Sequence, residues 1–252
     1  MTRAGAMRRV VGAAAALVAT LATTLATSGC ASLMTRARPA TPHAADAILA
    51  AGLTRERGLL GQRLTLSVRA TAGPPAARLA SPAYLAIDDP EHLRLQVLSP
   101  FGVTVLDLRV SGDDYTLQLP LRSETREGRI DLAALAAGET SEDDRMIVAL
   151  ALLFRPKMDR ARCRAAGPTA VTCPVGSDLT ATVSVDTALR PVREEYRDAG
   201  GRVLLVAELT EYPQAVVSDA LPGRITISDG QGGPALVIRV VRSRRAGDAE
   251  PA

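Results

Sequence analysis

The fold is decided by residues 93–108, which read LRLQVLSPFGVTVLDL. In the first half, leucine or valine at every second position alternates with a polar residue, which is the period of a half-buried β-strand. Residues 99–102 (SPFG) fit a type I turn, since serine suits its first position, proline presets φ at the second and glycine suits the fourth. A β-branched and aliphatic strand follows. We therefore predict a hairpin with Phe101 at its tip, either packed over the sheet edge or displayed for a function.

Similar short, alternating segments run along the rest of the chain. Further strands are predicted at residues 62–71, 84–87, 115–119, 124–130, 161–164, 171–173, 179–185, 192–196, 203–209, 224–228 and 236–241. Many short strands joined by turns indicate an antiparallel meander. The fold class is mainly β with some α, an unclosed antiparallel barrel or curved sheet.

Two helices are predicted, at residues 43–60 and 142–154. The second begins after Ser141, a good N-cap, and ends before Pro156. Its second half is almost wholly apolar, which predicts burial on more than one side. Helices that cover the concave side of a curved sheet incompletely would leave an apolar cavity.

The first 29 residues have the order of a secretory signal peptide. Arg3, Arg8 and Arg9 precede an uncharged, alanine-rich segment, residues 10–26, and small residues follow. An uncleaved membrane anchor is the alternative, but the segment is short for a membrane span. The expected organisation is a signal peptide (1–29), a lipidated tether (30–42), one folded domain (43–241) and a polar tail (242–252).

Residues 27–30 (TSGC) resemble a bacterial lipobox, in which the cysteine, here Cys30, is acylated and becomes the mature N-terminus. Thr27 departs from the aliphatic residue expected there, and a plain signal peptide with an incidental cysteine is the alternative. Ala31 follows in place of the aspartate that marks retention in enterobacterial sorting. The resemblance therefore implies palmitate-type acyl chains and a lipid-anchored position on the periplasmic face of the outer membrane.

The composition argues against several classes of function. Without the three arginines of the signal segment, 27 basic residues face 27 acidic ones, and the chain has no Trp, two Phe and two His. A neutral surface poor in aromatic residues does not suit nucleic acid. No nucleophile, zinc or phosphate-binding motif is present. We expect no enzyme, no catalytic residue and no cofactor or metal.

Two groups of residues could still suggest chemistry. Asp88, Asp89, Glu91 and His92 could be a metal or acid–base site, although a turn of solvated charges is the simpler interpretation. The segment 229–233 lacks the carboxylate spacing of a calcium loop.

The two cysteines of the predicted domain lie in adjacent strands of a predicted hairpin. Cys163 and Cys173 flank a Gly-Pro turn, and in the oxidising periplasm they should form a structural disulfide. Closing so short a loop contributes ~2–3 kcal/mol by the chain-entropy estimate. A redox role is disfavoured because there is no Cys-x-x-Cys motif.

Residues 93–108 also resemble the central hairpin of the LolB family of outer-membrane lipoprotein receptors, within the LolA/LolB superfamily. Residues 115–119 continue the match, residues 221–230 (LPGRITISDG) resemble the family's proline-led penultimate strand and turn, and residues 236–240 its last strand. The resemblance implies an unclosed barrel capped by helices that holds the acyl chains of lipoproteins received from a LolA-like periplasmic carrier. It also places Phe101 at the apolar, membrane-contacting position of a protruding loop.

The family's cavity uses several aromatic residues, whereas this chain would use aliphatic ones. Candidate cavity or core residues are Leu95, Val97, Val105, Leu117, Met146 and Leu150. The expected partners are membrane lipid and lipoprotein acyl chains, without nucleic acid, and the expected state is a monomer acting as a delivery chaperone. The alternative is a structural or adaptor lipoprotein of the envelope that uses the same fold without a bound lipid.

Overall fold

The computed structural model describes residues 44–71, 80–213, 221–230 and 236–247. The described residues all belong to one compact unit. The predicted signal peptide, Cys30 and the whole tether lie outside the described residues, so they stay predictions.

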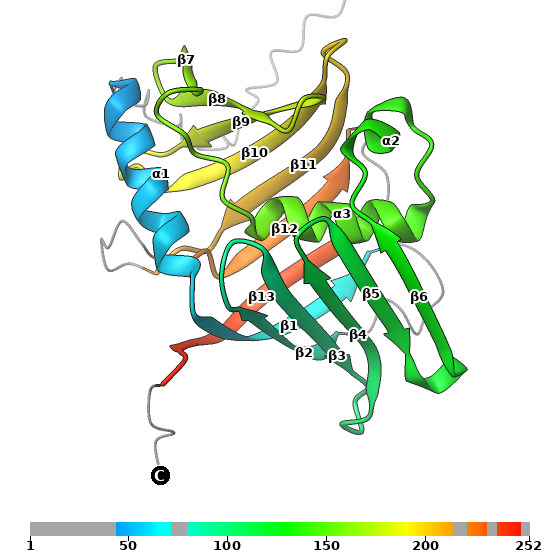
Figure 1. The fold of residues 1–252 in the computed structure, drawn as a ribbon. Helices are drawn as coiled ribbons and strands as arrows, with labels where there is room; N and C mark the ends of the chain where they lie inside the picture. Colours follow the sequence, from blue (N-terminus) through cyan, green and yellow to red (C-terminus); the bar gives the residue numbers. More distant parts are fainter. Residues whose placement is uncertain (1–43, 72–79, 214–220, 231–235, 248–252) are drawn as a thin grey trace, which may run out of the picture. The chain divides into compact units, whose positions relative to one another are not determined.

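Thirteen strands form one antiparallel sheet (Figure 1). Their order is β6-β5-β4-β3-β2-β1-β13-β12-β11-β10-β9-β8-β7, and the two edge strands β6 and β7 do not pair with each other. The sheet therefore stays unclosed, and the predicted fold class is confirmed. The strands are β1 (Gln62–Ala70), β2 (Ser81–Ile87), β3 (His92–Leu98), β4 (Thr104–Ser111), β5 (Asp114–Leu119), β6 (Glu124–Arg129), β7 (Arg164–Gly167), β8 (Ala170–Val175), β9 (Leu179–Val185), β10 (Pro191–Asp198), β11 (Val203–Thr210), β12 (Arg224–Asp229) and β13 (Leu236–Arg245).

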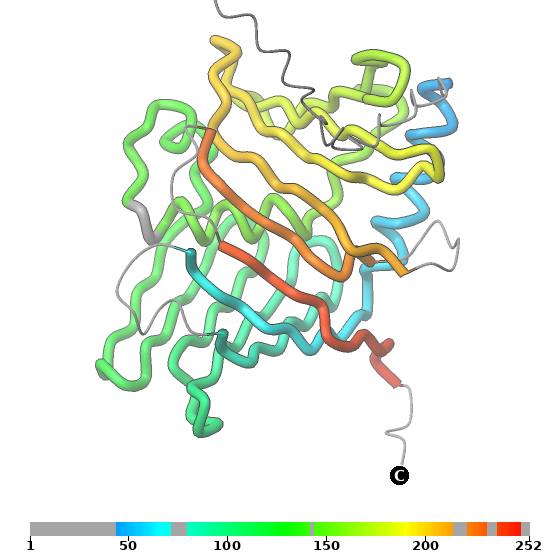
Figure 2. Tube along the Cα trace, turned by 180° about the vertical axis from the view of Figure 1, so that it is seen from behind, coloured from blue at the N-terminus to red at the C-terminus, as the bar shows by residue number. Residues whose placement is uncertain are grey.

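The first and last strands lie side by side in the middle of the sheet. Figure 2 shows β1, in cyan, next to β13, in red. The pairing corrects one predicted boundary, because β13 does not end at residue 241. Arg242 to Arg245 continue the strand opposite Gln62 to Thr65, so the start of the predicted polar tail is part of the sheet.

Among the described residues the structure has three α-helices, one more than predicted. The structure has α1 (Ala45–Leu59), α2 (Leu132–Ala137), α3 (Glu142–Phe154) and a short 3-10 turn, η2 (Pro120–Arg122). The unpredicted α2 is short but capped at both ends. The Asp131 carboxylate accepts a hydrogen bond from the Ala134 N–H (2.9 Å), and Gly138 takes the left-handed φ of +79° that ends many helices.

The helix α3 lies across the hollow of the curved sheet (Figure 1). Every residue from Ile147 to Phe154 is buried, and all belong to one core cluster with apolar side chains from both halves of the sheet. This burial on all sides explains why the second half of the helix has no polar residue.

The hairpin β3–β4 has the expected tight turn. The Gly102 N–H donates to the Ser99 carbonyl (2.9 Å), and the Ser99 N–H donates to the Val103 carbonyl (2.7 Å). Gly102 has φ +79°, a value that a side chain would disfavour, and the strand register shifts by one residue just before the turn. Phe101 is 92% exposed at the tip, so it does not pack on the sheet edge.

Candidate functional site

An apolar cavity lies between α3 and the inner face of the sheet. Its volume is about 110 Å³, and every residue around it is apolar. The lining comes from β1 to β4, β13 and α3: Leu66, Val68, Leu85, Leu93, Leu95, Val97, Leu106, Met146, Leu150, Phe154, Leu236 and Ile238. No charge or hydrogen-bonding side chain faces this space, so it suits hydrocarbon and nothing polar.

Four of the six candidate residues line this cavity: Leu95, Val97, Met146 and Leu150. Leu117 is buried in the same core cluster but does not reach the cavity. Val105 is only half-buried and belongs neither to the lining nor to the core cluster.

The reason for the wrong placement of Val105 is the register of β4. Leu106 pairs with Val97 and faces inward, so the residue before it points to the opposite face of the sheet. The irregularity at the turn shifts the inward face by one residue. In the sequence, only the alternation of Leu106 and Leu108 with Asp107 and Arg109 indicates this shift.

Two tyrosines on opposite halves of the sheet hold the ends of α3. At the N-terminal end, the Tyr115 hydroxyl on β5 donates to the Asp144 carboxylate. Hydrogen bonds from Ser141 and Tyr115 hold the pKa of Asp144 below its usual value. At the C-terminal end, the Tyr196 hydroxyl on β10 lies 3.0 Å from the Leu152 carbonyl oxygen. Both contacts fix the helix over the cavity.

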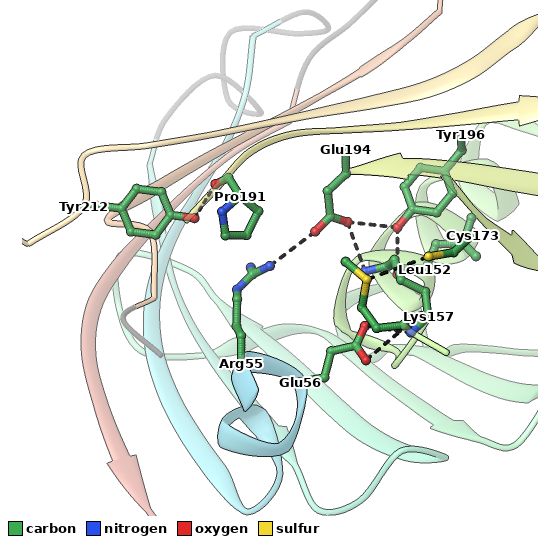
Figure 3. Close-up of polar contacts among 10 residues, drawn as sticks. Arg55, Glu56, Leu152, Lys157, Cys173, Pro191, Glu194, Tyr196 and Tyr212 are labelled. Atoms are coloured by element: carbon green, nitrogen blue, oxygen red, sulfur yellow. Dashed lines mark hydrogen bonds and ion pairs between the residues drawn. The ribbon is translucent and has the colours of Figure 1, made fainter. Parts of the chain in front are cut away.

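A buried ionic cluster joins α1, the segment after α3 and β10 (Figure 3). The Glu194 carboxylate is 1% exposed and lies 3.0 Å from the Lys157 Nζ and 3.3 Å from the Arg55 Nη1. The Tyr196 hydroxyl is 3.0 Å from the same carboxylate. Burial acts to raise the pKa of Glu194, but the charges of Lys157 and Arg55 outweigh it and lower the pKa below its usual value.

Glu56 holds the chain just after α3. Its Oε1 accepts hydrogen bonds from the backbone N–H groups of Lys157 (2.7 Å) and Met158 (3.1 Å). Burial raises the pKa of Glu56, against the opposing charge of Lys157. No member of this ionic cluster was predicted from the sequence. One signal was available: Lys157 is the chain's only lysine, and it lies three residues after an apolar helical run.

A second hollow opens beside the first half of α3. We call it the mouth; its volume is about 390 Å³, and it is lined by Arg145, Met146, Ala149, Leu205, Ile227, Ser228 and Asp229. Met146 lines both the mouth and the apolar cavity. Its flexible side chain is therefore part of the wall between them.

The mouth and the exposed tips lie at the same end of the strands. The pairing from β12 through β13, β1 and β2 to β3 brings the end of β12 at Asp229 to the end of the sheet that carries the Ser99–Gly102 turn. Three exposed apolar side chains stand at this end, Phe101, Val103 and Leu121, on neighbouring turns after β3 and β5.

The structure joins Cys163 and Cys173 in a disulfide between the turn before β7 and strand β8. Both cysteines belong to a second, smaller core cluster in which α1 packs on β8 and β9. The disulfide therefore fixes the part of the sheet on which α1 packs, and nothing in its surroundings adds chemistry.

The acidic turn before β3 has a local structural role. The Asp89 carboxylate accepts hydrogen bonds from the backbone N–H groups of Glu91 (2.8 Å) and His92 (2.9 Å) and also contacts the His92 ring. These hydrogen bonds lower the pKa of Asp89. Within the described part of the chain, no three His, Cys, Asp or Glu side chains come together as metal ligands would.

The described helices do not include a candidate membrane span. None of those between residues 44 and 247 combines the length and the apolar character needed to cross a bilayer.

Comparison with known proteins concerns the fold. No protein-family model matches the chain, and no curated protein matches it. Among solved structures, a LolA superfamily protein from Nitrosomonas europaea is 16% identical, with a TM-score of 0.52, over 82% of this chain and 96% of that one. A domain named for outer-membrane lipoprotein sorting, from Vibrio parahaemolyticus, is 15% identical at the same TM-score, over 81% and 93%.

A DUF1329 family protein from Desulfovibrio piger is 12% identical, again with a TM-score of 0.52, over 81% of this chain and 94% of that one. At these identities the likeness concerns architecture, and function has to be argued from the site. The chain thus has the unclosed, helix-covered antiparallel sheet found in proteins of the LolA superfamily.

Proposed function

We propose that this chain is a lipoprotein of the LolB type, anchored to the periplasmic face of the outer membrane, that binds acyl chains of lipids or lipoproteins and aids their delivery to that membrane. The observation that carries the proposal is the wholly apolar cavity beneath α3 on a LolA-like fold. Apolar burial, worth about 0.8 kcal/mol per CH₂ group, supplies the affinity without covalent chemistry. A LolA-like carrier would be the donor.

The anchor proposed at Cys30 is compatible with contact between the domain and its own membrane. Residues 30–42 form the tether, and an extended chain spans at most about 3.5 Å per residue, so the tether reaches about 45 Å. Such a length allows the end of the sheet that carries Phe101 to turn toward the bilayer.

The membrane-contact role of Phe101 has a matched control within the chain. Val241 is 67% exposed on β13, at the register shift opposite Thr65 and Leu66 in the middle of β1, and therefore away from the Ser99–Gly102 turn. In a Cys30→Ala background, which removes the anchor, Phe101→Asp should abolish sedimentation with vesicles, and Val241→Asp should leave it unchanged. Equal sedimentation of the two variants would refute the contact role.

Native mass spectrometry tests the cavity itself. The full chain, purified in mild detergent, should show an added mass that corresponds to a bound lipid with acyl chains. A Leu150→Trp variant, which fills the cavity from α3, should purify without that lipid while keeping its melting temperature within a few degrees. A lipid retained equally by this variant would place the binding site elsewhere.

The second candidate is an adaptor or scaffold lipoprotein with no ligand, and the size of the cavity favours it. About 110 Å³ is less than the roughly 150 Å³ of an engineered cavity that binds benzene, so a long acyl chain enters only if α3 or Met146 moves. A chain that purifies without lipid and binds no alkyl probe would support the adaptor.

A further inference from the structure

The apolar cavity and the mouth share one movable wall. Met146 lines both spaces, and an unbranched thioether side chain changes rotamer easily. Rotation of this side chain would join a hollow of about 390 Å³ to the apolar space behind it, which relieves the size limit on an acyl chain.

The mouth carries one cation without a partner. Arg145 is half-buried, and its guanidinium makes no hydrogen bond or ion pair with any residue in the described ranges. Asp229, the acidic residue of the same lining, already takes part in an interaction of its own. By contrast, Arg155, which directly follows α3, pairs with Asp113 at 3.1 Å. A half-buried guanidinium without a carboxylate favours an anionic ligand.

We propose that the mouth binds the head group of the ligand. Arg145 binds an anionic head group, and a change of rotamer at Met146 admits the acyl chain into the apolar cavity. This inference rests on the proposed acyl-binding function and adds to it a charge preference and an entry route. The ligand class is an acyl amphiphile with a phosphate or carboxylate head.

The position of the mouth supports this route. It opens at the end of the strands that also carries Phe101, the side chain proposed to touch the bilayer. A lipid head held at Arg145 would therefore stay near the membrane surface while its chain enters the protein. The same geometry would serve release in the opposite direction.

The test compares two alkyl probes that differ only in the head group, together with inorganic phosphate, which has no chain. The full chain in mild detergent is titrated with hexadecyl phosphate, hexadecanol and inorganic phosphate, and bound probe is counted by native mass spectrometry. Charge-assisted hydrogen bonds should make hexadecyl phosphate bind about tenfold or more tightly than hexadecanol. Arg145→Gln should erase this preference, and Arg145→Lys should keep most of it. Arg160→Gln, which changes an exposed arginine after α3, is the control.

Met146→Trp should slow the uptake of both alkyl probes, because a bulky side chain closes the wall. If Arg145→Gln leaves the preference for hexadecyl phosphate intact, the head-group role is wrong while acyl binding stands. If inorganic phosphate binds as tightly as hexadecyl phosphate, the mouth is an anion site without an acyl function, and the inference fails. If the wild type binds neither alkyl probe, the proposed function itself fails.

Discussion

The buried ionic cluster predicts a large loss of stability from a nearly isosteric substitution. Glu194→Gln keeps the size of the side chain and removes the negative charge that Lys157 and Arg55 share at 3.0 and 3.3 Å. Arg55 would then lose its buried ion-pair partner, and Lys157 would keep only the nearby charge of Glu56. Removing one partner from a buried ion pair costs about 3–5 kcal/mol, mostly as the penalty of the unpaired charge.

That cost is a large part of the stability of a domain, which is commonly about 5–15 kcal/mol. For a domain of this size, each 1 kcal/mol lowers the melting temperature by about 2–4 °C, so Glu194→Gln should lower it by roughly 6–20 °C. The loss should concentrate where α1 and the end of α3 meet β10, since these elements carry the cluster.

Urea unfolding at pH 7 measures the free energy, and hydrogen exchange locates the loss. The control is Glu208→Gln on β11, whose side chain is 57% exposed and 3.4 Å from Arg193. Exposed pairs contribute about 0–1 kcal/mol, so this variant should stay close to the wild type. A loss below 1 kcal/mol for Glu194→Gln, equal to that of the control, would refute the view that the cluster holds α3 in place.

Three further predictions concern other parts of the domain. Cys163→Ala should cost ~3 kcal/mol by the chain-entropy estimate for a short loop, measured by urea unfolding; an unchanged midpoint would contradict it. Gly128→Ala should destabilise the domain by about 1–3 kcal/mol and weaken the Tyr115–Asp144 contact that holds α3, because a Cβ there would lie 2.5 Å from the Tyr115 ring. Calorimetry of the two proteins measures the loss, and an unchanged melting temperature would contradict it. Hydrogen bonds from Arg94 lower the pKa of Asp107, so its contribution is present above the ordinary pKa and is lost as the pH falls through the folded value. The melting-temperature gap between wild type and Asp107→Asn should therefore narrow as the pH falls below about 4, and a gap that does not narrow on acidification would argue against it.

The sequence by itself determined the class of fold and most of its strands. Alternation along β3 and β9, the turn chemistry of residues 99–102 and the N-cap at Ser141 are local signals, and each was interpreted correctly because a strand or helix period needs only its own residues. Four of the six candidate cavity residues followed from the same periodicity.

The short helix α2 and the extension of β13 were missed for related reasons. Six residues give too little periodicity to indicate a helix, even with Asp131 and Gly138 as caps. Arg242 to Arg245 are too polar to predict a strand, and they form one because β1 offers its backbone partners.

Only the tertiary structure decided what the candidate site is. Val105 and Leu106 exchange faces through a register shift at a turn, and Glu194, Lys157 and Arg55 meet from three distant segments of the chain. Arg145 has no distinguishing mark in the sequence; it matters because the fold places it in the mouth, where it makes no ion pair with the part of the chain that the structure describes. Burial, pairing and cavity volume depend on contacts between residues far apart in the chain, and local periodicity holds no information about them.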